Sequence, residues 1–121
     1  MSISSAGLEA VPGDAPHAMA VPSATARGVD LRGHAATPVT REHVTASDVI
    51  LVMDVPQALV LRSRFPEARG KTFLLACMSP DAPLEIRDPF DGDESVFQTC
   101  YDDISKATRP IVSVLAARQR A

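Results

Sequence analysis

Two short apolar runs, separated by a segment of helical length, constrain this chain more than any other feature. Residues 49–53 read Val-Ile-Leu-Val-Met, and residues 72–76 read Thr-Phe-Leu-Leu-Ala. A continuous apolar run is typical of a strand that is covered on both faces. Between the runs, Pro56 suits the first turn of a helix and Pro66 stops that helix. This strand–helix–strand order predicts an α/β fold with a parallel sheet.

The N-terminal part of the chain predicts one more strand and one more helix. Residues 1–5 are compatible with a short strand, and a loop rich in Gly and Pro follows them. We expect a helix over 16–27, with Asp14 as its N-cap. Pro22 should kink or split this helix, because proline removes a backbone donor and clashes with the preceding turn.

The C-terminal part predicts a long loop and a long amphipathic helix. Thr40 is a plausible cap for a short helical turn before the first apolar run. Residues 77–94 hold three prolines and one glycine without apolar periodicity, so we expect a loop there, and loops of this length are usually functional. From 95 to 118 the apolar residues recur at helical spacing, with a bend expected at Pro110.

Composition argues against several classes of protein. The 121 residues, 45% apolar and 22% charged, are typical of one soluble globular domain. The net charge is −3 and basic residues form no run, so we expect no nucleic-acid partner. No apolar stretch approaches the roughly 20 residues that span a bilayer. The first twenty residues carry Glu9 and Asp14 but no Lys or Arg, unlike a signal peptide, which makes the cytoplasm the default location.

The two cysteines, Cys77 and Cys100, form neither a Cys-x-x-Cys pair nor a zinc pattern. A disulfide between them stays open, although two buried thiols are the simpler expectation in a cytoplasmic protein.

The acidic cluster of the long loop lacks the spacing of a calcium-binding loop. It suits a solvated loop before a helix N-terminus, so we expect no metal and no cofactor; its members are Asp88, Asp91, Asp93 and Glu94.

Four segments, taken in order, resemble the low-molecular-weight protein tyrosine phosphatases. Each segment alone is weakly specific, but together they extend over nearly the whole chain. They are Ser5-Ala6-Gly7, Gly28-Val29-Asp30-Leu31 with His34, Asp48-Val49-Ile50-Leu51-Val52-Met53-Asp54, and Ile86-Arg87-Asp88-Pro89-Phe90 with Gly92 and Phe97. The resemblance implies a three-layer α/β fold of the phosphotyrosine phosphatase I type over a single domain, residues 1–121. Its parallel sheet would have four strands in the family, with helices on both faces.

The resemblance also implies the chemistry of the site. In the family a Cys-x5-Arg loop cradles phosphate with backbone N–H groups, which lower the pKa of the attacking thiol, and the Arg binds phosphate oxygens. A distant Asp protonates the leaving oxygen as general acid, and Asp88 matches that residue. Phe90 matches the aromatic residue that lines the substrate pocket. Ser5 matches a serine that supports the phosphate loop, but here we expect only a turn serine. No role as base or metal ligand is expected for the three histidines, with His34 structural and His17 and His43 at exposed helix starts.

The phosphate-binding loop has no match in this chain. Six residues after Cys77 stands Pro83, and six after Cys100 stands Lys106, so neither cysteine begins a Cys-x5-Arg motif. The resemblance therefore implies a truncated domain that lacks the first strand and the first helix, a pseudoenzyme without turnover of a phosphoprotein substrate. A degenerate phosphatase that acts as a binding or regulatory module is the alternative. An arsenate reductase is less favoured, because it needs two neighbouring cysteines in a later segment.

Two further expectations follow from the missing strand. Its neighbours would be left with unpaired backbone groups, which predicts either direct pairing of the two or self-association through an exposed sheet edge. Phosphotyrosine and phosphoarginine both stay open as the family substrate, because Phe90-Asp91-Gly92 is closer to the bacterial variants, some of which act on phosphoarginine.

Overall fold

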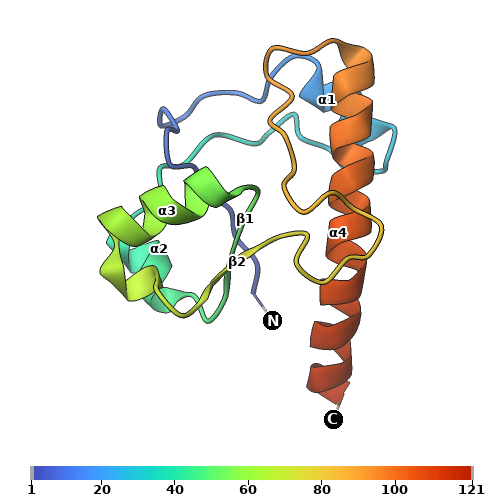
Figure 1. Ribbon diagram of the computed structural model, residues 1–121. Coiled ribbons are helices and arrows are strands. Elements are labelled where there is room, and N and C mark those ends of the chain that lie inside the picture. Colours follow the sequence, from blue (N-terminus) through green and yellow to red (C-terminus); the bar gives the residue numbers. More distant parts are fainter. Residues whose placement is uncertain (1, 121) are drawn as a thin grey trace.

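The computed structural model describes residues 2–120, with side chains through Arg118 (Figure 1). A long C-terminal helix stands on one side of a small parallel sheet, and the shorter helices α2 and α3 lie on the other side. The elements in chain order are α1 (Ala20–Thr25), α2 (Arg41–Ala46), β1 (Ile50–Val52), α3 (Val55–Arg64), the 3-10 turn η1 (Pro66–Ala68), β2 (Thr72–Leu74) and α4 (Glu94–Arg120).

The parallel sheet predicted from the two apolar runs is confirmed. Strands β1 and β2 pair in parallel, with Leu51 opposite Phe73. Both strands are shorter than the apolar runs by one or two residues at the ends. The crossover helix α3 begins as expected, because the Asp54 side chain accepts a hydrogen bond from the Gln57 N–H at 2.8 Å and Pro56 lies in the first turn.

The predictions for the N-terminal segment are partly wrong. Residue 1 lies outside the described residues, and residues 2–6 form no strand; the nearest ladder contact is an isolated bridge from Gly7 to Pro38. A strand forms only against a partner, and among the described residues neither β1 nor any other strand pairs with this segment. The alternative in which it closes up on β1 is therefore not realised.

The helix expected over 16–27 is only six residues long. Its N-cap is Met19 rather than Asp14, and no side chain caps it. Pro22 lies in the first turn of α1, where the missing N–H has no helical acceptor to lose, so the helix starts just before the proline instead of kinking at it. Gly28, at φ +79°, takes the left-handed conformation just beyond the helix end.

The C-terminal predictions hold better. Thr40 caps α2 in a reciprocal capping box with His43. Residues 77–93 contain no helix or strand, as expected of the long loop. Helix α4 contains Pro110, and its N-terminus is capped by Asp93, whose carboxylate accepts a hydrogen bond from the Val96 N–H at 3.2 Å. The Ser95 hydroxyl and then this N–H lower the pKa of Asp93, because both stabilise its charged form.

The hydrophobic core is divided into two clusters without a common residue. The first joins β1 to α2 and α3, and its buried members are Val44, Val52, Ala58, Leu61 and Ala68. The second joins the long loop to α4, and its buried members are Leu75, Ala76, Ile86, Cys100 and Ala107. The expectation of a sheet covered on both faces is wrong, because the facing pair Leu51 and Phe73 is 39% and 47% exposed. The N-terminal half of α4 covers only the end of that second face, through Met53 and Leu75.

The N-terminal end of helix α4 is held by contacts with the α1 segment. Arg27, which follows α1, donates to the Gln98 side chain at 2.7 Å and to Asp102 at 2.5 Å, and its guanidinium lies 5.5 Å from the centre of the Tyr101 ring. These contacts fix the first turns of α4, from which the site described next is built.

No helix within residues 2–120 combines the length and apolar character needed to cross a membrane.

Candidate active site

Asp88 lies on the long loop at the carboxyl end of β1. The loop is anchored there by Ile86, which is buried and donates its N–H to the carbonyl oxygen of Met53 at 2.9 Å. Two residues later the Asp88 side chain is exposed. One of its carboxylate oxygens accepts the Phe90 N–H at 3.0 Å, a turn that fixes the direction of the carboxylate. Asp88 thus lies near the carboxyl end of a parallel strand, which is where open α/β sheets place their sites.

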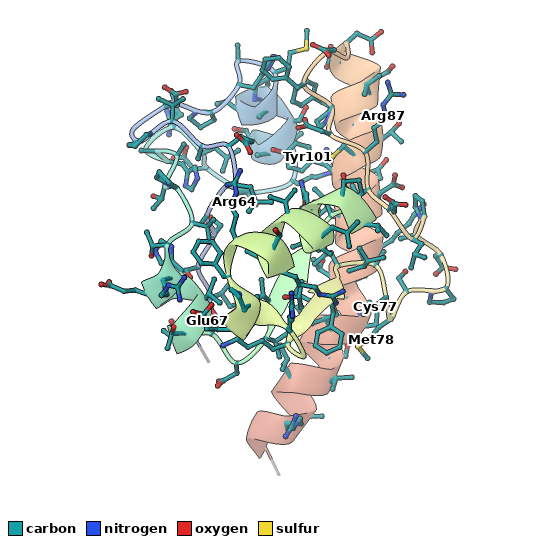
Figure 2. All side chains as sticks on the ribbon, turned by 60° about the vertical axis from the view of Figure 1, so that its left-hand side comes forward. Arg64, Glu67, Cys77, Met78, Arg87 and Tyr101 are labelled. Atoms are coloured by element: carbon teal, nitrogen blue, oxygen red, sulfur yellow. The ribbon has the colours of Figure 1, made fainter. Side chains whose placement is uncertain are left out.

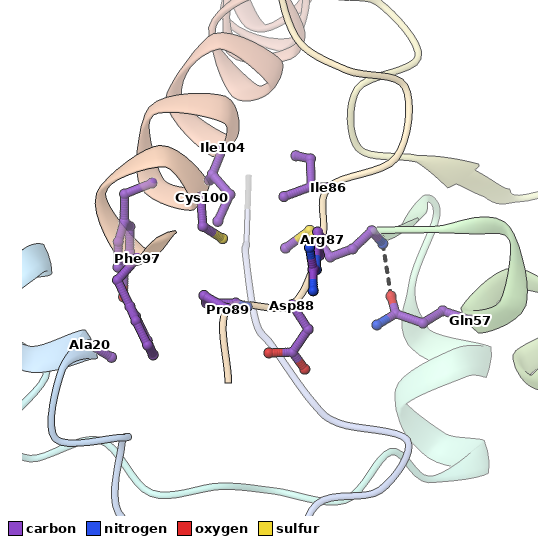
Figure 3. A pocket seen from close by; sticks show the side chains of 11 residues that line it. Ala20, Gln57, Ile86, Arg87, Asp88, Pro89, Phe97, Cys100 and Ile104 are labelled. Atoms are coloured by element: carbon purple, nitrogen blue, oxygen red, sulfur yellow. Dashed lines mark hydrogen bonds between the residues drawn. The ribbon is translucent and has the colours of Figure 1, made fainter. Parts of the chain in front are cut away.

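Asp88 borders an apolar cavity of about 300 Å³ between β1, α3 and α4 (Figure 3). Gln57 closes one side, and its side-chain oxygen accepts the Met53 N–H at 2.8 Å, which satisfies this backbone donor. The first three turns of α4 close the other side. The complete lining is Ala20, Met53, Gln57, Ile86, Arg87, Asp88, Pro89, Phe97, Cys100, Tyr101 and Ile104.

The thiol of Cys100 faces this cavity but is poorly suited to nucleophilic attack. Cys100 is 9% exposed, on the apolar face of α4, so its burial is confirmed. Burial raises the pKa of its thiol, and the negative charges of Asp103 and Asp88 raise it further. A nucleophilic cysteine needs the opposite surroundings, a helix N-terminus or cations that stabilise the thiolate. Cys100 is therefore a protonated core thiol at neutral pH.

The thiol of Cys77 lies elsewhere. Cys77 is exposed in the turn after β2, which corrects the expectation of a buried thiol. It does not line the Asp88 cavity, and Figure 2 shows it beside Met78, apart from Arg87. Both cysteines are free, so the disulfide that the sequence left open does not form. Two separated thiols, one exposed and one buried, also lack the neighbouring pair that an arsenate reductase needs.

Phe90 is held by an aromatic contact that the sequence did not reveal. It is 66% exposed and does not line the cavity beside Asp88. The imidazole of His17 lies edge-on to its ring, with centroids 5.6 Å apart, and also packs against Phe97 at 4.8 Å. His17 thus joins the loop before α1 to the Asp88 loop and α4. A contact across more than seventy residues leaves no local signal in the sequence.

The other candidate residues, which are the histidines, Ser5 and the acidic cluster, lie outside the lining of the Asp88 cavity except for Asp88 itself. His43 completes the capping box of α2, and His34 is exposed beside a smaller cavity that Ser5 also lines. Asp93 caps α4, which accounts for one member of the acidic cluster. In the described part of the chain no three His, Cys, Asp or Glu side chains come close enough together to hold a metal ion.

Comparisons with known proteins agree on one family. The family described as low molecular weight phosphotyrosine protein phosphatase matches residues 1–121. The probable low-molecular-weight protein-tyrosine-phosphatase AmsI of Erwinia amylovora is 32% identical over 114 residues, which is 94% of this chain and 78% of AmsI. This chain belongs to the low-molecular-weight protein tyrosine phosphatase family, as the resemblance predicted.

Solved structures confirm the fold. Vibrio vulnificus Wzb, solved in complex with benzylphosphonate, superposes with a TM-score of 0.85 at 29% identity, covering 93% of this chain and 78% of Wzb. The YwlE arginine phosphatase from Geobacillus stearothermophilus gives 0.87 at 26% identity, covering 96% of this chain and 75% of YwlE. About a fifth to a quarter of each relative therefore has no counterpart in residues 1–121.

Proposed function

We propose that residues 1–121 carry the general-acid part of a low-molecular-weight phosphatase site and do not hydrolyse phosphate esters by themselves. The observation that supports this most directly is the contrast between Asp88 and the cysteines. Asp88 is exposed at the carboxyl end of β1 with its carboxylate oriented by the Phe90 N–H, whereas Cys100 is buried with a raised pKa and Cys77 lies outside the cavity.

The proposed role of Asp88 is to protonate the leaving oxygen of a phosphate ester. A carboxylic acid on an exposed loop has access to a bound substrate, and its turn with Phe90 limits the directions that the acid takes. No cation pairs with Asp88 among the ion pairs of the described residues, so a purely structural ion pair does not account for it.

What residues 1–121 do not supply is the group that attacks phosphorus. Hydrolysis of a phosphate monoester is among the slowest uncatalysed reactions, so the site must provide a very large rate factor. A general acid typically contributes about 10²–10⁴-fold, and only where a nucleophile attacks. Neither cysteine is followed by Arg at the sixth position, and Cys100 is kept protonated.

For the substrate, we propose a phosphorylated protein side chain that packs against Phe90. Phe90 is two residues from Asp88 and presents an exposed ring, which His17 supports at its edge. Such a ring suits either the phenyl group of phosphotyrosine or the planar guanidino group of phosphoarginine. The chain would act in the cytoplasm, where its free thiols stay reduced. Alone, it would self-associate through the open edge of β1.

The test is turnover of p-nitrophenyl phosphate by purified residues 1–121. We expect no rate above the buffer blank, and no difference between the wild type and Asp88→Asn. Turnover that iodoacetamide abolishes, and that Cys77→Ser or Cys100→Ser also abolishes, would overturn the proposal, because one of these thiols would then be the nucleophile.

A further inference from the structure

The loop segment around Asp88 has few polar ties to the rest of the molecule. Ile86 anchors the loop before this segment, and Asp93, the cap of α4, anchors it afterwards. Between these anchors the hydrogen bonds of residues 87–92 stay within the loop, as does the bond from the Phe90 N–H to Asp88. Among the described residues, no hydrogen bond or ion pair joins 87–92 to another segment. The direction of Asp88 therefore depends on side-chain packing.

The imidazole ring of His17 supplies a packing contact from a distant segment. It meets the ring of Phe90 edge-on, with centroids 5.6 Å apart and an angle of 77° between the ring planes. This arrangement is favourable, because the positive edge of one ring meets the negative face of the other. Since Phe90 is 66% exposed, little else covers its ring. The contact thus ties the Asp88 loop to the segment before α1.

The His17 ring is itself held from two other directions. It packs against Phe97 in the first turn of α4, with centroids 4.8 Å apart, and Phe97 is only 3% exposed. Its Nδ1 accepts the Met19 N–H at 3.1 Å, which requires an unprotonated Nδ1 and sets the orientation of the ring. A ring that is fixed in this way can impose a position on Phe90.

We propose that His17 is a positioning residue for Asp88 and acts through Phe90. The ring of His17 holds the ring of Phe90, and the N–H of the same Phe90 holds the Asp88 carboxylate at 3.0 Å. A general acid must point at the leaving oxygen, so the direction of its carboxylate affects the rate. His17 does not line the cavity beside Asp88, and it therefore acts on the acid and not on the reacting atoms.

This positioning role rests on the proposed function, because it takes Asp88 to be the general acid. Its test measures the side-chain rotamer of Asp88 in residues 1–121, whereas the acid role itself is measured by turnover. An error in the positioning role would leave the effect of Asp88→Asn on turnover in place. The two failures are therefore distinguishable.

The test is an NMR measurement on residues 1–121, using three-bond couplings at Asp88 and hydrogen exchange at the Phe90 amide. In the wild type we expect a single χ1 rotamer for Asp88. His17→Ala should average the Asp88 rotamers and speed exchange at the Phe90 amide about 2- to 10-fold, the factor that corresponds to the loss of one aromatic pair. An Asp88 rotamer that stays single in a folded His17→Ala chain would overturn the proposal.

Two further substitutions separate the ring of His17 from its hydrogen bond. His17→Phe keeps an aromatic ring and removes the acceptor of the Met19 N–H, whereas His17→Asn keeps an acceptor and removes the ring. We expect the single Asp88 rotamer to persist in His17→Phe and to be lost in His17→Asn. The reverse pattern would contradict the proposal, because His17 would then act through Met19 alone. The same pair decides if His17→Ala does not fold.

The route through Phe90 is tested by a double variant. Phe90→Leu keeps the N–H and removes the ring, so it should average the Asp88 rotamers as His17→Ala does. Combining the two should have no further effect, because both break the same contact. Additive effects would mean that His17 reaches Asp88 by another route. His34→Ala is the matched control, since His34 is exposed beside the smaller cavity, and it should change exchange at the Phe90 amide less than about twofold.

Discussion

The two faces of the β1–β2 sheet have similar sequences but different surroundings. On one face Val52 packs with Leu61 and Ala58 of α3 and with Val44 of α2, and all four are buried. On the other face Leu51, the direct neighbour of Val52, is exposed together with Phe73. The apolar runs that encode the strands do not distinguish the two faces. An apolar run therefore shows that a strand is compatible with burial on both faces. It does not show that both faces are covered in a given chain.

The two ends of the candidate site differ in the same way. The acid end is assembled, with Asp88 held by its own turn and the loop anchored by Ile86 at the end of β1. The opposite end presents the protonated thiol of Cys100 and the side chain of Gln57, which accepts the Met53 N–H. Both contrasts involve β1 and the segments that flank it.

The largest expected effect is a difference in the free energy of unfolding between substitutions on the two faces of the sheet. Leu61→Ala removes a side chain that is 3% exposed in the covered cluster, and we expect a loss of about 2–5 kcal/mol in the free energy of unfolding. Leu51→Ala, on the open face, should cost less than about 1 kcal/mol, because the partly exposed Leu51 side chain buries little apolar area on folding. Urea denaturation of the two variants measures both values. Equal losses would mean that the open face is covered in solution.

A smaller change in the free energy of unfolding is expected when the pH is raised and Cys100 titrates. Because the folded chain raises the pKa of Cys100, it favours the protonated thiol, and this contribution to stability is fully present below the ordinary cysteine pKa of about 8.5. As the pH rises from there through the pKa of the folded state, the contribution is lost. We expect the free energy of unfolding to fall between pH 7 and 9.5 in the wild type, and to fall less in Cys100→Ala.

Asp88→Asn gives the control for this pH effect. Removing the negative charge of Asp88 removes one of the causes of the raised pKa, so the fall with pH should be smaller than in the wild type but should not vanish, since burial is the first cause. Asp91→Asn, on the same loop, should behave like the wild type. Identical curves for Asp88→Asn and the wild type would mean that the Asp88 carboxylate is not near the thiol.

The sequence predicted well wherever an element carries its own signal. Asp54 with Pro56 marks the start of α3, Thr40 marks the start of α2, and both caps form in the structure. The N-terminal strand failed because a strand needs a neighbour, which residues 2–6 do not find. The helix expected over 16–27 shrank because Pro22 is accepted only near a helix start.

The site was predictable in part for the same reason. Asp88 stands in a contiguous motif, Ile86-Arg87-Asp88-Pro89-Phe90, so its place on the loop could be expected from the sequence. The contact of His17 with Phe90 and Phe97 joins distant segments, and the exposure of Cys77 depends on the turn after β2. Such features follow from packing between elements, which a single sequence does not reveal.

The most direct test of the proposed general-acid role is to measure turnover in a chimera with Vibrio vulnificus Wzb. The parts of Wzb without a counterpart would be joined to residues 1–121 in the order that Wzb has. We predict turnover of p-nitrophenyl phosphate that residues 1–121 alone do not show, a loss of about 10²–10⁴-fold in kcat on Asp88→Asn, and no loss on Asp91→Asn. A folded but inactive chimera, or an active one that Asp88→Asn leaves unchanged, would contradict the claim that this chain supplies the general acid of the site.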